Sequence, residues 1–408
     1  MSALKDLFKN PTAAELEFAE SYAKLPYSGQ RERNFEAFAQ TGLPNKRVES
    51  WKYSDLRNAV PDFSVVAASE VPESPLVSVE NALEIRLNAT GVVLPKSSAD
   101  GVTISRKADA LAMMGAEDVP VAALGAALSA NPHLIVVEIS KPVMQPIHLV
   151  FENDGKLNFS RVIILVREGA SAVVLESQLA GSGFSSGVLE YKLEPGATLE
   201  RVVYQEAAGR AVQVFTAIAQ LEQGAAFRQF SLGFGAKLCR HETRVFHQGE
   251  GTTATINGAY LLSSGQHYDQ TSLVRHSAPD CKTRQVCKGA VLDGAEAVFQ
   301  GKFYVARKAQ KTDAAMAHNA LILENGGSVD AKPELEIYAD DVECAHGNTV
   351  GALDADALFY MRQRGLTETA ARALLTEAFI LAAFDGLEDG ISEILSASAR
   401  NWLEAQLW

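Results

Sequence analysis

Four stretches of the chain repeat one pattern: EGASAVVLES (168–177), PGATLERVVY (195–204), QGAAFRQFSL (223–232) and EGTTATINGAYL (250–261). Their glycines, at positions 169, 196, 224 and 251, recur every 27 or 28 residues. Each glycine is followed by a small residue and then by a run typical of a β-strand. A fixed period in this range indicates a repeat protein, and strand-like rather than helical runs favour stacked β-coils.

The alternative fold is an antiparallel sandwich in which this spacing is accidental. Two later turn sequences, Asp293-Gly294 and Asn325-Gly326, break the period. We interpret them as insertions into a pattern that continues. We therefore expect a mainly β core of stacked coils over residues 76–349.

Helical patterns precede the β core. Thr12 and Glu15 have the spacing of a capping box, so they predict a helix N-terminus. A second helix is expected over residues 30–40, and residues 61–75, rich in proline, serine and glutamate, predict a linker. We assign residues 1–75 to an N-terminal helical region with its linker.

A second helical region, residues 350–408, follows the β core. Asp354 and Thr367 can each cap a helix, and a third helix is expected from about residue 388. The segment 373–384 is apolar nearly all round. Such a helix is buried either against the β core or under a partner, and the sequence leaves both open.

The charge of the chain excludes two classes of function. Its 37 Lys and Arg residues face 50 Asp and Glu residues, so the net charge is −13. This balance argues against a general nucleic-acid binder and against a polybasic membrane-surface protein. The first ten residues have no apolar core of a secretory signal, and the longest strongly apolar stretch, 378–384, is too short to span a bilayer. We expect a cytoplasmic protein with reduced thiols.

Familiar catalytic motifs are missing from the sequence. It contains no Walker A loop, no GxSxG, no HExxH and no CxxC. The chain is therefore not expected to be an enzyme by itself.

Two Cys-x-His pairs are candidates for metal binding. In each pair, Cys344 with His346 and Cys239 with His241, a strand places both side chains on one face. A thiolate and an imidazole suit zinc, iron or an iron–sulfur cluster, but two ligands make an incomplete site. The position of Cys344 and His346 at the end of the β core favours an exposed site. For the other pair, a buried cysteine beside an exposed histidine is the simpler interpretation.

Other cysteines and histidines form a looser group. Cys281 and Cys287 lie among basic residues that either lower a thiol pKa or form a solvated loop. His241, His247, His267 and His276 would cluster if the coils stacked them in register, which the sequence does not establish.

Two segments resemble the SufB/SufD family of iron–sulfur cluster assembly proteins: ECAHGNTVGALDADALFYMRQRGL (343–366) and LPNKRVESWKYSDL (43–56). Gly347, directly after His346, favours the SufD branch over the SufB branch. The resemblance extends over the three-zone organisation of essentially the whole chain. It implies that the coils form a flattened right-handed parallel β-helix.

The resemblance also implies a non-catalytic subunit that works in a complex. The partners would be a SufB-like paralogue and two copies of a SufC-like ATPase, which supplies the missing nucleotide site. His346, and Cys344 as a possible second ligand, would bind iron or a nascent cluster at the interface with the SufB-like partner. The isolated chain would hold no cofactor stably, and it could form a homodimer.

The family's C-terminal helices dock the ATPase. The resemblance therefore implies a docking surface formed by Leu358, Phe359, Tyr360, Leu374, Leu375, Phe379, Ile380 and Phe384. Two other functions remain open: a purely structural adaptor for the ATPase that never contacts metal, and a β-helix enzyme that acts alone.

Overall fold

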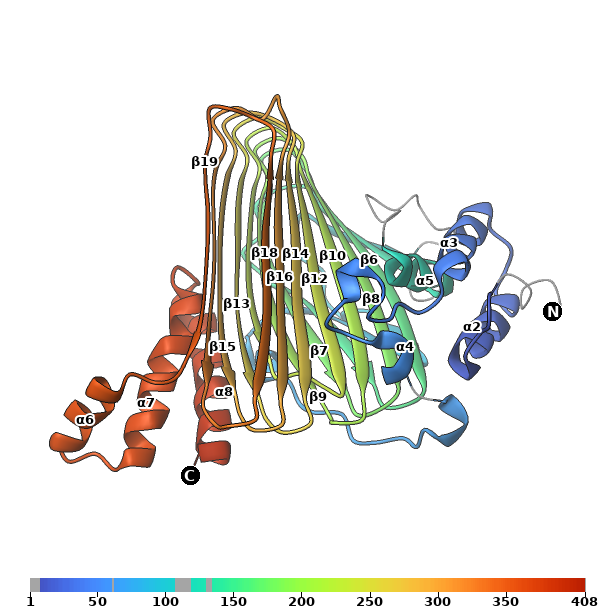
Figure 1. The fold of residues 1–408 in the computed structure, drawn as a ribbon. Helices are drawn as coiled ribbons and strands as arrows, with labels where there is room; N and C mark the ends of the chain where they lie inside the picture. Colours follow the sequence, from blue (N-terminus) through green and yellow to red (C-terminus); the bar gives the residue numbers. More distant parts are fainter. Residues whose placement is uncertain (1–7, 61, 107–118, 130–133, 408) are drawn as a thin grey trace.

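The computed structural model describes residues 8–60, 62–106, 119–129 and 134–407. Its centre is a β-solenoid in which the chain passes back and forth between two facing sheets (Figure 1). The first sheet consists of β1 (Leu83–Asn88), β2 (Gly91–Val93), β5 (Ile147–Asn153), β7 (Ser171–Ala180), β9 (Thr198–Ala207), β11 (Ala226–Gly233), β13 (Thr253–Leu262), β15 (Lys282–Val291), β17 (Asp313–Ile322) and β19 (Glu343–Gly351). The second sheet consists of β3 (Val102–Arg106), β4 (Leu134–Ile139), β6 (Leu157–Val166), β8 (Phe184–Leu193), β10 (Val212–Leu221), β12 (Leu238–His247), β14 (His267–His276), β16 (Glu296–Val305) and β18 (Ser328–Ile337).

The strand register confirms the repeat. Ser171 lies opposite Thr198, Thr198 opposite Ala226, and Ala226 opposite Thr253, so these three coils span the 27 or 28 residues predicted by the glycines. These pairs are parallel, and among the described strands the antiparallel pairs are β1–β2 and β3–β4 at one end. The antiparallel sandwich is therefore wrong.

One row of turns, which leads from the second sheet into the first, carries the repeat. Its four glycines have φ between 66° and 69°. The row continues with Asp280 and Lys311, both at φ 57°, which follow the preceding turn residues by 29 and 31 positions. Gly294 and Gly326 belong to the opposite row of turns. The pattern thus continues into slightly longer coils, as we interpreted it, but its turns lie at Asp280 and Lys311, where non-glycine residues occupy two left-handed positions.

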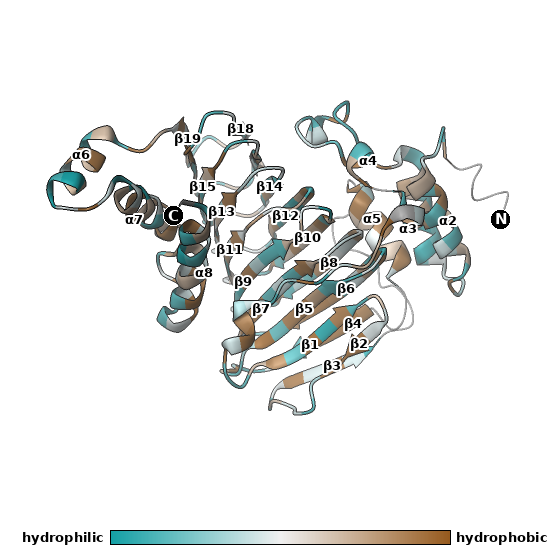
Figure 2. Cartoon of the chain, turned by 90° about the horizontal axis from the view of Figure 1, so that it is seen from below, coloured by the Kyte–Doolittle hydropathy of each residue, from teal (hydrophilic) through white to brown (hydrophobic). Residues whose placement is uncertain are grey.

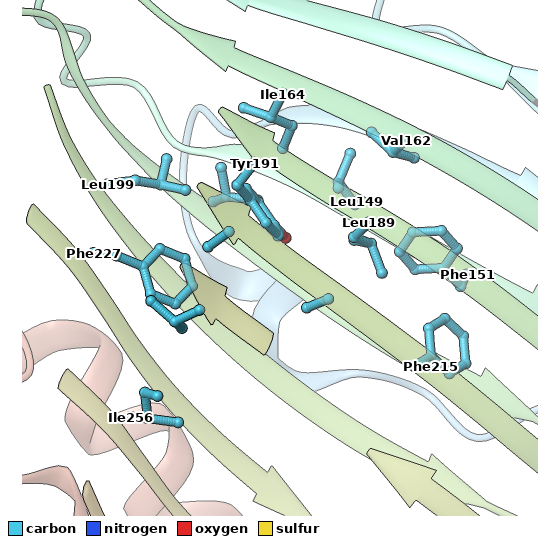
Figure 3. Close-up of a cluster of buried hydrophobic side chains, with 14 of the residues drawn as sticks. Leu149, Phe151, Val162, Ile164, Leu189, Tyr191, Leu199, Phe215, Phe227 and Ile256 are labelled. Atoms are coloured by element: carbon cyan, nitrogen blue, oxygen red, sulfur yellow. The ribbon is translucent and has the colours of Figure 1, made fainter. Parts of the chain in front are cut away.

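Apolar side chains fill most of the space between the two sheets. Figure 3 shows part of this cluster, with Leu149, Phe151, Val162, Ile164, Leu189, Tyr191, Leu199, Phe215, Phe227 and Ile256. Alternate residues of each strand point inward, so both sheets contribute to one continuous core. The core also contains a fully buried ion pair, in which Arg201 Nε lies 2.6 Å from Glu176 Oε1.

The N-terminal region covers the outer face of the second sheet (Figure 1). It contains α2 (Ala13–Ala23), α3 (Gly29–Thr41), η1 (Glu49–Trp51) and α4 (Leu56–Ala59), and the linker that follows contains η2 (Phe63–Val65) and η3 (Pro75–Ser78). The predicted capping box of Thr12 and Glu15 is present. Helix α5 (Pro120–Leu128) was not predicted; its residues are mostly buried between α3 and the sheet.

The C-terminal region packs on the outer face of the first sheet, on the other side of the solenoid (Figure 2). It contains α6 (Ala355–Gln363), α7 (Glu368–Leu381), η4 (Ala382–Phe384) and α8 (Asp389–Leu407). Asp354 and Thr367 cap α6 and α7 as predicted. In the part of the chain that the structure describes, no helix is both long and apolar enough to cross a membrane.

Candidate functional site

The last coil of the solenoid leaves its end open. β18 and β19 are the terminal strands of their sheets, and each is hydrogen-bonded to one neighbouring strand. β19 is exposed along its whole length except at Cys344, which is half-buried. Three large apolar side chains, Ile337, Tyr338 and Val350, are 39%, 56% and 42% exposed beside this edge. A free parallel edge with apolar side chains is a surface that a second β-protein can extend.

Cys344, His346 and Asn348 share one face of β19, and we call them the terminal row. They lie in register with Ala314, Met316 and His318 of β17, which are buried in the interior of the solenoid. The terminal row therefore faces the same side as the core, at the point where the core meets solvent. The predicted common face of Cys344 and His346 is confirmed.

The two candidate ligands differ in their surroundings. Cys344 packs against a small apolar cluster of Val305, Ala309, Ala339 and Val342. This partial burial raises the pKa of its thiol. His346 is exposed, so its imidazole is free to bind a metal ion without displacing packed atoms.

The chain supplies too few ligands here for a closed metal site. Among the described residues, no group of three or more His, Cys, Asp or Glu side chains is close enough to hold a metal ion. A thiolate and an imidazole fit iron by donor type, but a stable centre needs further ligands. The terminal row thus offers two donors of a type that suits iron, and the described residues do not complete a site around them.

A hydrogen-bonded chain runs from the terminal row into the core. His318 Nδ1 lies 2.6 Å from Asn348 Oδ1, and His318 Nε2 lies 2.9 Å from the Tyr260 hydroxyl. Burial lowers the pKa of His318 to about 4, so this imidazole is neutral. Asn348 was not predicted as a site residue, although its position two residues after His346 places it on the same face.

Cys239 and His241 lie inside the solenoid, away from the end. Both side chains are buried, and desolvation raises the pKa of the thiol and lowers that of the imidazole. His241 Nε2 lies 3.4 Å from Arg201 Nη1. Our expectation of an exposed histidine was wrong, because strand alternation turns His241 inward together with Cys239.

The coils bring two of the four suspected histidines together. His247 and His276 stack with ring centroids 4.5 Å apart, and both bond to the Thr283 hydroxyl. His241 lies elsewhere in the core, and His267 bonds to Ser54 near the outer face of the second sheet.

Cys281 and Cys287 are also buried, and they are not activated by their basic neighbours. Cys281 lies 3.1 Å from the Thr252 hydroxyl, and Cys287 lies 3.1 Å from Gln270 Oε1. Desolvation raises the pKa of both thiols. Burial therefore opposes the lowered thiol pKa that the basic residues suggested.

The structure divides the expected docking residues of the C-terminal helices into two groups. Phe359, Tyr360 and Leu374 are 64%, 58% and 46% exposed, and Leu358, Leu375 and Phe379 are half-buried. Ile380 and Phe384 are buried against the first sheet, and they are corrected here to packing residues. One face of α7 thus packs on the β core, while the other remains accessible.

The N-terminal motif anchors its segment to the second sheet. The Arg240 guanidinium stacks over the Trp51 ring at 4.2 Å and donates to the Ser50 carbonyl. Ser54 donates a 2.6 Å hydrogen bond to Asp269, which also pairs with Arg240. The motif therefore has a structural role.

Comparison with known proteins gives the family. The family model of the SUF system FeS cluster assembly SufBD core domain matches residues 149–379, more than half of the chain. The SufD iron–sulfur cluster assembly protein of Escherichia coli is 28% identical over 382 residues, which cover 89% of each chain.

Two further relatives belong to the same family of iron–sulfur cluster assembly proteins. A SufBD family protein of Synechocystis is 30% identical, with 83% of this chain and 82% of the relative covered. The SufB protein of Bacillus subtilis is 26% identical over 64% of this chain and 57% of its own length. The chain thus belongs to the SufBD family of iron–sulfur cluster assembly proteins, and it is SufD-like, as its two motifs predict.

Proposed function

We propose that this chain is a subunit of an iron–sulfur cluster scaffold, and that iron and sulfide assemble at the open end of its solenoid. The observation that carries the proposal is the common face of Cys344 and His346 on the terminal strand β19. In this proposal His346 is an iron ligand, Cys344 is a second ligand or a close neighbour, and a SufB-like partner supplies the rest.

The same end is the proposed contact with the SufB-like partner. β18 and β19 offer free edges, and Ile337, Tyr338 and Val350 offer exposed apolar surface. A paralogous solenoid can continue both sheets through main-chain hydrogen bonds. A second copy of this chain has the same edges, so a homodimer of the isolated chain is part of the proposal.

The C-terminal helices are the proposed docking region for a SufC-like ATPase. Phe359, Tyr360 and Leu374 are exposed on α6 and α7. Next to Leu374, a small cavity of about 210 Å³ lies between α7 and α8. Exposed aromatic side chains and small apolar pockets are each typical of protein–protein contact surfaces.

The connection between the two regions is short, which suggests how ATP hydrolysis drives assembly. Three residues separate β19, which ends at Gly351, from α6, which begins at Ala355. When two ATPase subunits approach each other, a displacement of α6 pulls directly on the strand that carries Cys344 and His346. The interface then opens for iron entry, as in other two-state interfaces.

In this proposal the chain itself catalyses no reaction and retains no cofactor when isolated. Iron and sulfide are its cargo, the ATPase partner hydrolyses the nucleotide, and the complex works in the cytoplasm. The competing function is a structural adaptor that organises the ATPase without contacting metal; in that case the cluster lies entirely on the SufB-like partner.

The test is anaerobic co-purification of the chain with its SufB-like and SufC-like partners, followed by measurement of iron and acid-labile sulfide. We expect His346→Ala to assemble the complex but to lose both iron and sulfide. Thr349→Ala is the matched control, because Thr349 lies on the opposite face of β19 and bonds to Asn319. If the His346→Ala complex carries as much iron and sulfide as the wild type, the chain is instead a structural adaptor for the ATPase.

A further inference from the structure

We infer that the side-chain amide of Asn348 donates hydrogen bonds to the sulfide of the assembling cluster. His318 and Tyr260 act as positioning residues that hold this amide in its donating orientation. The inference rests on the proposed function, because it requires iron and sulfide at the terminal row.

The first step is the direction of the hydrogen bonds. The Asn348 oxygen Oδ1 faces His318 Nδ1 at 2.6 Å, and an amide oxygen only accepts. His318 therefore carries its proton on Nδ1, and its Nε2 accepts from the Tyr260 hydroxyl at 2.9 Å. Along the series Tyr260, His318 and Asn348, each residue thus donates its hydrogen bond in the direction of the open end.

The second step is the rigidity of the arrangement. His318 is fully buried, and its ring stacks on Phe299 with centroids 4.5 Å apart and planes 5° from parallel. Tyr260 is also fully buried. Because both ring nitrogens are occupied and the ring is packed, the imidazole has one orientation and one tautomer.

The third step concerns the hydrogen-bond donors of Asn348 that remain free to bind a ligand. Asn348 is exposed, and among the described residues its nitrogen Nδ2 has no protein partner. Since Oδ1 is held from within, the two N–H groups of Nδ2 face outward on the same side as Cys344 and His346. Anionic sulfur in a cluster accepts such hydrogen bonds, and they help to set its reduction potential.

The experiment uses the complex with its partners and separates two stages. Ferrous iron alone is supplied first, and sodium sulfide second. We expect Asn348→Ala and the nearly isosteric Asn348→Leu to bind iron as the wild type does, but to take up sulfide roughly tenfold less tightly, the usual effect of losing an outer hydrogen bond at a metal site. Any cluster formed in Asn348→Ala should have a more negative reduction potential.

One further variant tests the positioning role of His318, and a second serves as its control. His318→Phe keeps an aromatic ring against Phe299 but loses both hydrogen bonds, so it should shift sulfide uptake and reduction potential in the same direction as Asn348→Ala. Thr349→Ala, on the opposite face of β19, should match the wild type.

The inference is overturned if the Asn348 variants match the wild type in both sulfide uptake and reduction potential, and its positioning part is overturned if His318→Phe does. Failure of the proposed function has a different signature: His346→Ala then keeps its iron in the first stage.

Discussion

Histidines buried as neutral rings couple the stability of this molecule to pH. His276 lies in the core, stacked on His247 and bonded to the Thr283 hydroxyl. Its desolvation lowers the pKa from 6.5 to about 4. The folded state therefore keeps the ring neutral in a pH range where the unfolded chain protonates it.

The free energy of unfolding should therefore fall as the solution is acidified. The contribution of His276 is complete above pH 6.5 and is lost as the pH falls toward about 4. Between pH 7.5 and pH 5 this one ring accounts for about 2 kcal/mol. Urea unfolding at both pH values should show a correspondingly smaller pH difference in His276→Gln. An equal difference in variant and wild type would contradict the burial of a neutral ring.

Some contacts of single residues could be predicted from the sequence, and others could not. The common face of Cys344 and His346 follows from strand alternation alone, so it was predicted. The contact of Asn348 with His318 joins positions 30 residues apart, and it depends on the exact register of β17 and β19. The period of the last coils differs from 27 or 28 residues, so that register was not available from the sequence.

Among the elements, the row of turns from the second sheet into the first determines the register of the coils. Four of its left-handed positions hold glycine, and two hold Asp280 and Lys311. An L-residue with a side chain is disfavoured there by on the order of 1 kcal/mol. The four glycine turns were predicted from the sequence. The turns at Asp280 and Lys311 were not, because neither residue is specific for a turn.

Substitutions in this row should have opposite effects. Lys311→Gly should stabilise the fold by up to about 1 kcal/mol, because glycine adopts φ 57° without strain. Gly251→Ala should destabilise it by about 1–2 kcal/mol through backbone strain alone, since a Cβ at this position would meet no atom within 4 Å. Thermal and urea unfolding measure both, and destabilisation by Lys311→Gly would contradict this assignment.

Helix α7 has one face for the β core and another that is accessible. Ile380 is fully buried in the cluster with the first sheet, whereas Leu374 is 46% exposed. The sequence predicted the helix and its cap, but it left open which apolar residues pack internally. That division depends on which face of α7 contacts β13 and β15.

Substitutions on the two faces of α7 should have different effects, one on ATPase binding and the other on folding. Leu374→Asp should leave the free energy of unfolding nearly unchanged and abolish binding of the SufC-like ATPase. Ile380→Asp places a carboxylate in the core and should prevent stable folding. Circular dichroism and a pull-down with the ATPase distinguish these results. Full ATPase binding by folded Leu374→Asp would exclude this face as the docking surface.

On the scale of the whole molecule, the two helical regions and the open end have separate places. The N-terminal helices cover the second sheet, the C-terminal helices cover the first, and the last coil remains exposed between them (Figures 1 and 2). The stacked coils were predictable from the glycine period. The position of Cys344 and His346 at the end of the β core also favoured an exposed site, but the sequence did not show that β18 and β19 are the terminal strands of their sheets in the described part of the chain.

In the proposed complex, this chain binds iron at the open end through His346. Electron–nuclear double resonance on the reduced, cluster-loaded complex tests it directly, when only this chain carries ¹⁵N-labelled histidine. We expect a ¹⁵N coupling to the cluster that disappears in His346→Ala. A cluster that shows no coupling to this chain's histidines, or the same coupling in His346→Ala, would contradict it.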